Sequence, residues 1–485
     1  MTLLGETVWQ DRIYRDGWIP GTGGTRAVTE PATGERLGGI GLAGADDVAL
    51  AASRAAEAQR AWAATAPSAR AAVLRKAAEL CTAHRAELED WLIREAGSVL
   101  AKAALETDMA AGICFEAAAL PTHPGGEVLS TEAPHWSFAR RLPAGVVSVI
   151  APFNFPLILA IRSVAPALAL GNAVLLKPDP RTAVSGGVTL VRVFEEAGLP
   201  PGLLQLLPGE AEVGAAVIEA PEVSVVSFTG STSAGRKVGA AAAGALKRVH
   251  LELGGNNALV VLPGADVAAA AAAGAFGSFL HQGQICMTTG RHLVHESQLD
   301  DYVAALATKA RALPVGNPAR ADVAIGPIID DTQLAHVDRL VSRGIAAGAT
   351  AVAGGKPDPP YFPPTVLSGL DETNPAWREE IFGPVAPVLG YRDLDEAVRI
   401  VNDTEYGLSV GILGDVGVAM TLADRVHSGK VHINDQTVAD EPTVPFGGLK
   451  ESGNGARFGG AQANIEAFTE TQWLTVRPEI AEYPF

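Results

Sequence analysis

The chain has 485 residues, of which 48% are hydrophobic and 19% are charged, a composition typical of globular proteins. A single hydrophobic core stops growing at about 250–300 residues, so we expect two or more domains. The chain contains 37 Lys and Arg against 54 Asp and Glu, which gives a formal net charge of -17. This balance argues against a nucleic-acid-binding protein and against a polybasic protein of the membrane surface.

The three cysteines, Cys81, Cys114 and Cys286, are far apart and form no CxxC pair. We therefore expect neither a disulfide framework nor a metal site, and a reducing, cytoplasmic setting fits best. The first residues lack a basic region followed by an apolar core, so we expect no signal peptide. The uncharged stretch 142–161 is long enough to span a bilayer, but its prolines and Asn154 favour a buried strand and loop.

The predicted elements begin with a helical region over 45–119, which PTHPGG ends at residues 121–126. Alternating residues over 128–147 then predict a hairpin or paired strands. From residue 143, short apolar runs alternate with helical segments, which is typical of a parallel sheet covered by helices. The expected strands are GVVSVIAPF, NAVLLKP, LLQLLPG and VSVVSFTG, and the expected helices lie near 157–170, 182–197 and 211–219.

A second alternating series begins near Gly254–Gly255 and predicts a second α/β domain. It consists of the strand NNALVVLPG, an alanine-rich helix over 265–280, the strand RHLVHE and a helix over 298–312. TQWLTVRP, at 471–478, predicts a further strand after this domain.

Two turns have residues suited to a nucleotide. In SFTGSTSAGR, an apolar run ends at Gly230 and Ser231 before a helix, so backbone N–H groups at a helix N-terminus could face a phosphate. The spacing from Gly230 to Gly235 is not GxGxxG, and an ordinary turn between strand and helix is the alternative. In LLKPDPRT, Lys177 ends a strand at the edge where α/β sheets bind ligands, and a solvated loop lysine is the alternative.

Three further segments contain candidate polar groups. The amide of Asn154 lies among aromatic residues and prolines in APFNFPL, where it could stabilise an oxyanion or satisfy loop backbone. Glu252 precedes two glycines in HLELGGNN, and a partly buried glutamate with a raised pKa could act as a general base. In EEIFGPV, Glu380 could bind a ribose and Phe382 a flat ring, or the segment could be a charged loop and a structural turn.

Cys286, in GQICMTTGR, is the candidate nucleophile. A free cysteine is more often a small buried hydrophobe, so this residue alone decides nothing. Together, however, a cysteine nucleophile, an amide donor, a glutamate base and nucleotide-binding turns form a complete set for the covalent oxidation of a carbonyl.

These residues resemble the aldehyde dehydrogenase superfamily from about residue 20 to the C-terminus. The resemblance depends on seven segments in the family's order: PFNFPL, LKPDPRT, FTGSTSAGR, LELGGNN, GQICMTTGR, EEIFGPV and PFGGLKESG. The separation of 34 residues between Glu252 and Cys286 also resembles the family's. LKPDPRT, HQGQICMTTGR and VHINDQTVADEPTVPFGG look most like the benzaldehyde and vanillin dehydrogenase branch.

The resemblance implies an α/β fold with a Rossmann-like nucleotide-binding domain, a second α/β catalytic domain and a small β oligomerisation element. The nucleotide-binding domain would comprise 1–120 and 144–254, and the catalytic domain 255–455. The oligomerisation strands would lie in 121–143 and 470–485, and the assembly would be a homodimer or homotetramer.

The resemblance also implies NAD(P)-dependent oxidation of an aldehyde to the carboxylic acid. The resemblance to the benzaldehyde and vanillin dehydrogenase branch implies that this aldehyde is aromatic. Cys286 would attack the aldehyde to give a thiohemiacetal and then a thioester, with the oxyanion held by the Asn154 side chain and the Cys286 N–H. Glu252 would activate the hydrolytic water.

In the cofactor site that the resemblance implies, Lys177 and Glu380 would hold the two riboses, and Ser231, after Gly230, would contact the pyrophosphate. Phe382 would border the nicotinamide.

One position departs from the family pattern. Many NAD-preferring members have a glutamate where this chain has Pro180, so repulsion of a 2′-phosphate is lost and we expect NADP use beside NAD. Arg181 would add positive charge there, and Asp179 would partly restore discrimination.

Three alternative functions stay open from the sequence. A CoA-acylating aldehyde dehydrogenase would use the same chemistry, although such enzymes often lack the glutamate that is present here as Glu252. A non-catalytic nucleotide-binding protein could have the same fold, since fold does not fix function. A cofactor-independent cysteine hydrolase is the third.

Overall fold

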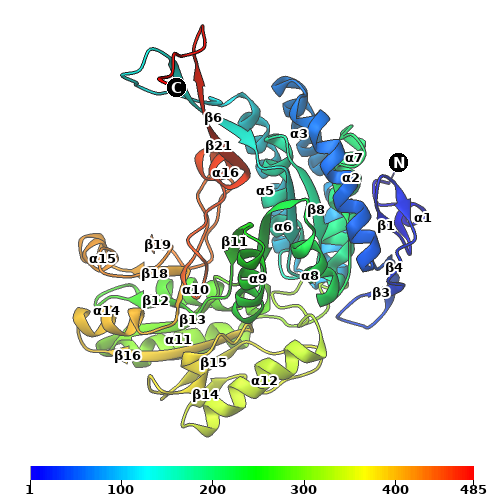
Figure 1. The fold of residues 1–485 in the computed structure, drawn as a ribbon. Helices are drawn as coiled ribbons and strands as arrows, with labels where there is room; N and C mark the ends of the chain where they lie inside the picture. Colours follow the sequence, from blue (N-terminus) through cyan, green and yellow to red (C-terminus); the bar gives the residue numbers. More distant parts are fainter. Residues whose placement is uncertain (1) are drawn as a thin grey trace.

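Two seven-stranded sheets, each covered by helices, form the body of the molecule (Figure 1). The computed structural model describes residues 2–485. A third, antiparallel sheet projects from the first unit and includes the C-terminal strand. The predicted fold class, a Rossmann-like α/β domain, a second α/β domain and a small β element, is confirmed.

The first sheet has the strand order β11-β10-β7-β8-β9-β1-β2, and its first five strands are parallel. The chain extends the sheet from β7 to β8 and β9, and later adds β10 and β11 on the other side of β7. A crevice therefore opens at the carboxyl ends of β7 and β10, where open α/β sheets bind ligands. The strands are β1 (Ile13–Tyr14), β2 (Trp18–Ile19), β7 (Val146–Ile150), β8 (Ala173–Lys177), β9 (Leu204–Leu206), β10 (Val223–Thr229) and β11 (Arg248–Glu252).

Helices cover both faces of this sheet. One face contacts α2, α8 and α9, and the other contacts α6 and α7, behind which α3, α4 and α5 are packed. These helices are α2 (Ala45–Ala63), α3 (Pro67–Ala83), α4 (Arg85–Ala96), α5 (Leu100–Ala119), α6 (Pro156–Ala169), α7 (Thr189–Glu196), α8 (Ala211–Glu219) and α9 (Thr232–Gly244).

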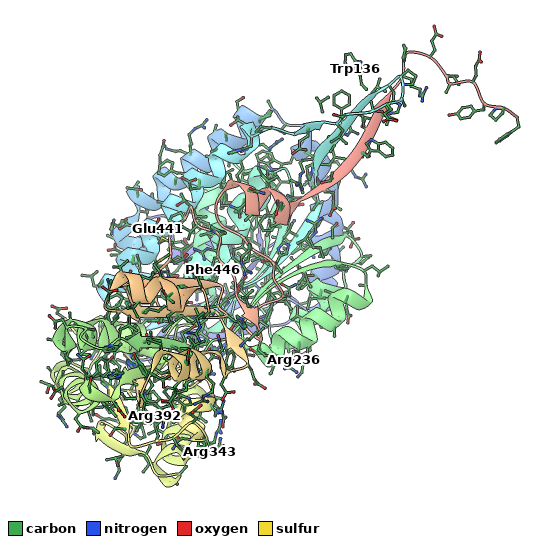
Figure 2. The ribbon with its side chains drawn as sticks, turned by 90° about the vertical axis from the view of Figure 1, so that its left-hand side faces the viewer. Trp136, Arg236, Arg343, Arg392, Glu441 and Phe446 are labelled. Atoms are coloured by element: carbon green, nitrogen blue, oxygen red, sulfur yellow. The ribbon has the colours of Figure 1, made fainter. Side chains whose placement is uncertain are left out.

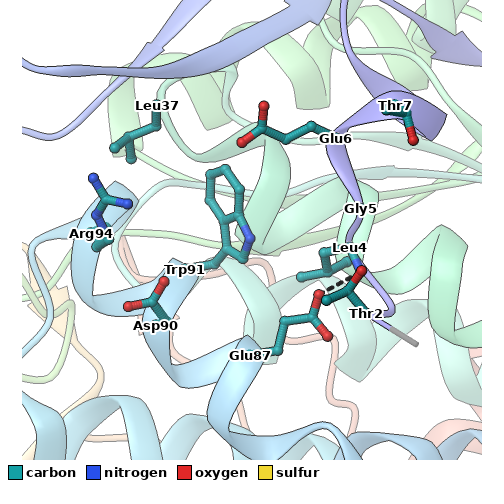
Figure 3. Close-up of a pocket in the computed structure, with 10 residues that line it drawn as sticks. All are labelled: Thr2, Leu4, Gly5, Glu6, Thr7, Leu37, Glu87, Asp90, Trp91 and Arg94. Atoms are coloured by element: carbon teal, nitrogen blue, oxygen red, sulfur yellow. Dashed lines mark hydrogen bonds between the residues drawn. The ribbon is translucent and has the colours of Figure 1, made fainter.

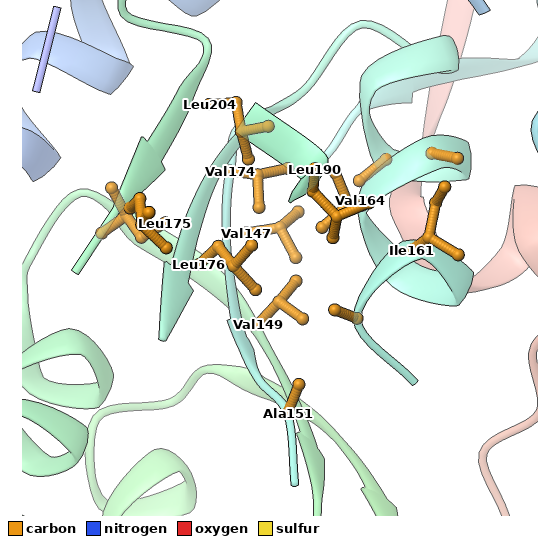
Figure 4. Close-up of a cluster of buried hydrophobic side chains, with 14 of the residues drawn as sticks. Val147, Val149, Ala151, Ile161, Val164, Val174, Leu175, Leu176, Leu190 and Leu204 are labelled. Carbon is orange, nitrogen blue, oxygen red and sulfur yellow. The ribbon is translucent and has the colours of Figure 1, made fainter. Parts of the chain in front are cut away.

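The core between α6 and the first sheet consists of apolar side chains from both the helix and the strands. Every residue of β7 and β8 is buried, as expected for parallel strands covered on both faces. Figure 4 shows Val147 and Val174 of the sheet beside Val164 of α6 and Leu190 of α7, and all four side chains are fully buried. Burial of each such side chain contributes about 1.5–3 kcal/mol, so this packing fixes where the crevice lies.

The second sheet has the order β14-β15-β16-β13-β12-β18-β19, parallel except for β14 at one edge. Two hydrophobic clusters, one on each face, join it to its helices. The strands are β12 (Asn257–Val261), β13 (Thr289–His295), β14 (Thr350–Ala353), β15 (Thr365–Ser368), β16 (Val385–Tyr391), β18 (Ser409–Leu413) and β19 (Lys430–Ile433). The helices are α10 (Val267–Phe279), α11 (Leu299–Ala312), α12 (Asp331–Ala346), α13 (Pro375–Arg378), α14 (Leu394–Asn402) and α15 (Val416–Ala423).

The projecting sheet pairs β5 (Gly126–Val128) with β6 (Trp136–Pro143), and β6 with β21 (Thr469–Val476). Its outer part exposes large apolar side chains: Trp136 is 73% exposed, Trp473 70% and Val128 77%. Figure 2 shows Trp136 at the far end of this arm. The predicted paired strands over 128–147 and the predicted C-terminal strand are both present.

Smaller elements complete the described chain. They are α1 (Glu6–Trp9), β3 (Thr25–Thr29), β4 (Arg36–Gly41), β17 (Tyr406–Gly407), β20 (Leu449–Lys450) and α16 (Ala461–Phe468). The uncharged stretch 142–161 forms the end of β6, β7, a loop and the start of α6. Within residues 2–485, no helix has both the length and the apolar character needed to cross a membrane.

The helix expected near 182–197 is less regular than predicted. A 3-10 turn over Pro180–Thr182 and a π-helix over Val184–Val188 precede α7. The buried carboxylate of Glu95 accepts hydrogen bonds from the backbone N–H of Val184 and Ser185 and from the Ser185 hydroxyl. Gly186 lies so close to Pro156 that an added Cβ would be 2.9 Å from its carbonyl oxygen. These tertiary contacts decide the local geometry.

Candidate active site

A cavity of about 930 Å³ occupies the crevice at the carboxyl ends of β7, β8 and β10 and extends to the second unit. Its volume lies within the usual range for ligand pockets, about 300–1,000 Å³. Most of the predicted site residues line it: Asn154, Lys177, Gly230, Ser231, Cys286, Glu380 and Phe382. Glu252 is next to the lining residues Leu253 and Gly254, but does not itself line the cavity.

The start of α9 lines the cavity with Ser231, Thr232, Ser233 and Ala234. Ser231 is the N-cap of this helix, and its Oγ accepts a hydrogen bond from Ala234 N at 3.3 Å. A Cβ on Gly230 would lie 2.6 Å from the Phe228 ring, and one on Gly235 would lie 2.2 Å from Leu253 Cδ2. The two glycines therefore let the turn and the helix pack closely, with the free N–H groups of the helix N-terminus facing the cavity. These residues fit a dinucleotide pyrophosphate.

Lys177 lies at the end of β8 with 8% of its surface exposed. Its Nζ is 3.4 Å from the carbonyl oxygen of Pro178, and burial lowers its pKa. The ammonium has donor capacity left for a ribose hydroxyl.

Arg181 does not supply the free positive charge that we expected from the sequence. Its Nε and Nη2 donate to the two Asp179 oxygens at 2.9 and 2.7 Å, and its Nη1 donates to Asp330 at 2.6 Å. The guanidinium also lies 4.2 Å from the Phe153 ring centroid. That expectation was wrong because two carboxylates neutralise Arg181, and Asp179 is occupied by the same pairing.

Glu380 and the Gly254–Gly255 turn form one unit. Glu380 Oε1 accepts a hydrogen bond from Gly255 N at 2.8 Å, and burial raises its pKa to about 7. A Cβ on Gly254 would lie 2.2 Å from Glu380 Oε2, so no larger residue fits there. Phe382 follows with a φ of 53°, and its ring meets that of Phe153 edge-on at 6.0 Å between centroids.

Cys286 lies in the loop between α10 and β13, and its backbone is fixed by the second sheet. Its carbonyl oxygen accepts a hydrogen bond from Asn257 Nδ2 at 2.9 Å, and Asn257 also binds Thr288 O and Ser409 N. A Cβ on Gly255 would be 2.4 Å from the same carbonyl oxygen. Burial raises the pKa of the Cys286 thiol to about 12, so deprotonation needs help from neighbouring groups.

Asn154 points its amide at the loop that contains Cys286. Its Nδ2 donates to Gln284 O at 2.8 Å, which leaves the second N–H of the amide for another acceptor. The following helix, α6, is held at its start by Glu106, whose Oε1 accepts from Leu157 N and Ile158 N at 2.8 and 3.1 Å. Glu106 is paired in turn with the fully buried Lys102 at 2.5 Å.

Glu252 is the last residue of β11 and is only 3% exposed. Neither of its carboxylate oxygens has a hydrogen-bond partner within residues 2–485. Burial raises its pKa well above the ordinary value, an effect that the charges of Arg457, Arg162 and Lys430 and the nearby backbone N–H of Gly448 oppose. Buried polar groups are normally paired, so an unpaired carboxylate whose charge acts on the Cys286 thiol is a candidate proton acceptor.

A smaller cavity of about 390 Å³ near the N-terminus does not offer comparable chemistry (Figure 3). The Glu87 carboxylate on its wall already accepts hydrogen bonds from Leu3 N and Leu4 N at 2.8 and 2.7 Å. Over the whole described chain, no group of three or more His, Cys, Asp or Glu side chains is arranged to hold a metal ion.

The structure adds residues that sequence reasoning missed. Asn257 is the last residue of the LELGGNN segment, so that motif could have suggested it, but its role depends on the contact with the distant Cys286. Gln284, Glu106 and Lys430 have no local sequence signal, because each acts through a contact with a distant segment.

Comparisons with known proteins agree with this geometry. A model of the aldehyde dehydrogenase family matches residues 18–474. The chain is 59% identical to a vanillin dehydrogenase of Amycolatopsis sp. over 486 residues, 100% of both chains. It is 43% identical to a benzaldehyde dehydrogenase [NAD(+)] of Pseudomonas putida, with 99% of each chain covered.

A solved structure is also similar. The crystal structure of a salicylaldehyde dehydrogenase from Pseudomonas putida G7, complexed with salicylaldehyde, matches with a TM-score of 0.94 and 35% identity. The match covers 98% of this chain and 99% of the other. By its sequence, its fold and the residues gathered around its cavity, this chain belongs to the aldehyde dehydrogenase family.

Proposed function

We propose that the protein oxidises aromatic aldehydes, of the benzaldehyde or vanillin type, to carboxylic acids with NAD. The observation that carries this proposal is the convergence of Cys286, Asn154 and the unpaired Glu252 beside a cavity that suits a dinucleotide. The names of the vanillin, benzaldehyde and salicylaldehyde dehydrogenases support an aromatic substrate.

In the proposed reaction, the Cys286 thiolate attacks the aldehyde carbon and forms a thiohemiacetal. The free N–H of the Asn154 amide and the backbone N–H of Cys286 stabilise the oxyanion. Loss of hydride from the carbon then leaves a thioester on Cys286. NAD, when bound, accepts that hydride at its nicotinamide ring.

Glu252 completes the cycle as the proposed general base. It removes a proton from water, and the resulting hydroxide attacks the thioester carbon, so that the carboxylic acid leaves and the cysteine is regenerated. The raised pKa of Glu252 fits this role, because a more basic carboxylate is a better proton acceptor.

For the cofactor, we propose that Lys177 and Glu380 bind the riboses, and that Ser231 and the N-terminus of α9 bind the pyrophosphate. Phe382 would border the nicotinamide end. All four of these side chains line one cavity, which supports the assignment.

The alternatives are less well supported. A CoA-acylating enzyme has no need of a buried base, whereas Glu252 is present and unpaired. A non-catalytic protein leaves the close approach of the cavity to Cys286 without a purpose, and a cofactor-independent hydrolase has no use for the part of the cavity lined by Lys177, Ser231 and Glu380.

We also propose the domain division 1–120 with 144–254, 255–455, and 121–143 with 470–485, which the separate sheets support. The apolar side chains of the projecting sheet support a homodimer or homotetramer, since exposed strand edges and large apolar patches are normally covered. Three free cysteines support a reducing, cytoplasmic compartment.

The first prediction concerns substrate choice. We expect kcat/KM for benzaldehyde to exceed that for acetaldehyde by roughly 30- to 150-fold, because burying the ring contributes about 2–3 kcal/mol. The measurement is reduced-cofactor formation over a panel of aldehydes, with cyclohexanecarboxaldehyde as the size-matched control. Faster oxidation of acetaldehyde than of benzaldehyde would contradict the aromatic assignment.

The second prediction separates Cys286 from Glu252. Cys286→Ala should lower aldehyde oxidation by roughly a thousandfold or more while cofactor binding persists. Glu252→Gln should still give a burst of about one reduced cofactor per active site and then stall, because an amide is a poor base. Mass spectrometry should find one acyl group on the peptide that contains Cys286.

Glu132 is exposed, so Glu132→Gln serves as the matched control for Glu252→Gln and should behave as the wild type. If Glu252→Gln gives no burst, Glu252 acts before hydride transfer. A burst from Cys286→Ala would disprove the nucleophile assignment.

The third prediction concerns the cofactor. We expect NAD to be preferred and NADP to be used measurably. Position 180 is a proline and not a glutamate, and the Asp179 carboxylate is paired with Arg181, so repulsion of the 2′-phosphate of NADP is weak. Pro180→Glu should lower kcat/KM for NADP about tenfold more than for NAD, since a like charge is placed near the 2′-phosphate. Pro180→Gln is the uncharged control. An equal loss with both cofactors would show that position 180 does not face the 2′-phosphate.

The fourth prediction tests the projecting sheet. Light scattering should give a particle of two or four times the 50.0 kDa chain. The double change Trp136→Glu and Trp473→Glu should release monomers, because it places charges in the apolar surface of the arm. Val416→Glu, at an exposed apolar residue of α15, is the control and should leave the assembly intact. A wild-type monomer at micromolar concentration would refute the assembly.

A further inference from the structure

An ammonium group is held beside the loop of the nucleophile. Lys430 is the first residue of β19, and its Nζ donates to Ala439 O at 3.1 Å and lies 2.6 Å from Met287 Sδ. It also lies 4.1 Å from the centroid of the Phe446 ring. Met287 directly follows Cys286, so these contacts fix a positive charge next to the thiol.

No neighbouring carboxylate in the described chain forms a direct ion pair with this charge. Arg162, 4.7 Å from the same Phe446 ring, is paired with Asp440. Lys430, in contrast, has no carboxylate within 4.0 Å among the described residues. A buried cation without an anion is costly, so this ammonium gains most when an anion forms close to it.

The anion that can form close to Lys430 is the thiolate of Cys286, and the charged groups around it affect the pKa of both residues. Burial raises the pKa of the thiol, and Glu380, Glu252 and Asp440 raise it further, whereas Lys430 lowers it. The effect is mutual: burial lowers the pKa of Lys430 to about 8, while Asp440, Cys286 and Glu252 raise it and Arg162 lowers it again. His432, on the same strand, is half-buried, and burial lowers its pKa.

We propose that Lys430 is a positioning residue that supplies the counter-charge for the Cys286 thiolate. The inference rests on the proposed role of Cys286 as the nucleophile. The thiol proton leaves to water or to a base, and Lys430 keeps its own proton and forms no covalent bond. Thiolate and ammonium stabilise each other across the Met287 contact, so the two groups titrate as a pair.

The test measures thiolate formation without turnover. Iodoacetamide labels the free enzyme between pH 6 and pH 10, and mass spectrometry follows the peptide that contains Cys286. Because Cys81 and Cys114 are 0% exposed, labelling of the native protein reports Cys286 alone. This readout is independent of aldehyde oxidation, so failure of the inference differs from failure of the proposed function.

Lys430→Met should lower the labelling rate at pH 7.5 about tenfold and displace the curve of labelling rate against pH upward by about one pH unit, since one pKa unit changes the thiolate fraction tenfold. Lys430→Arg keeps the charge and should stay within about threefold of the wild type. Asp440→Asn removes a negative charge that raises the Cys286 pKa, so it should displace the same curve downward.

Lys450→Met is the matched control. The substitution changes the net charge in the same way, but the Lys450 Nζ donates to the carbonyl oxygens of Asn402 and Thr404 at 3.0 and 3.1 Å. The labelling profile of Lys450→Met should therefore equal that of the wild type. Melting temperature and NAD binding establish that each variant is folded.

Two results would overturn the inference. One is a folded Lys430→Met protein that is labelled as the wild type but has altered kcat/KM for ring-substituted aldehydes, which would place the lysine on the substrate. The other is a Lys430→Arg protein whose labelling rate falls as much as that of Lys430→Met. If Lys430→Met does not fold, the labelling of Asp440→Asn provides the test. Unchanged or slower labelling of that variant would contradict the proposed control of the Cys286 pKa by these neighbouring charges.

Discussion

The chemistry of this protein depends on one close approach, that of the Gly254–Gly255 turn to Cys286 and Glu380. The turn joins the last strand of the first sheet to the first strand of the second, and any side chain on it would collide with the Glu380 carboxylate or the Cys286 carbonyl. Because neither glycine of the turn has a side chain, Glu252 at the end of β11, Cys286 before β13 and the cavity at the edge of the first sheet come close together, which the proposed roles of base and nucleophile require.

A second constraint is the low polarity of that meeting point. Burial raises the pKa of Glu252, Cys286 and Glu380 and lowers that of Lys430, so in each group burial disfavours the charged form. Such shifts are typical of sites in which protons move during a reaction. The structural carboxylates behave differently: Glu106 and Glu95 are engaged with backbone N–H groups, whereas Glu252 has no partner in the described chain.

The supporting contacts are distributed over the whole chain. Asn154 is oriented by Gln284 and by the start of α6, which the buried Lys102–Glu106 pair fixes. Breaking a buried pair by removing one partner typically costs 3–5 kcal/mol, so a change in α5 would displace an amide in the active site. Asn257 holds Cys286 in the same way from the second sheet.

The sequence by itself determined the elements and the identity of the reactive side chains. Continuous apolar runs such as NAVLLKP predicted buried parallel strands, and the ordered motifs identified Cys286, Glu252 and Asn154, because these features depend on local pattern and residue type. Tertiary structure decided what depends on distant partners. Arg181 is neutralised by Asp179 and Asp330, the chain before α7 is distorted by Glu95, and Lys430 reaches Met287 across 143 residues. Charge balance and burial at a site are sums over segments that only folding brings together, so a linear pattern does not contain them.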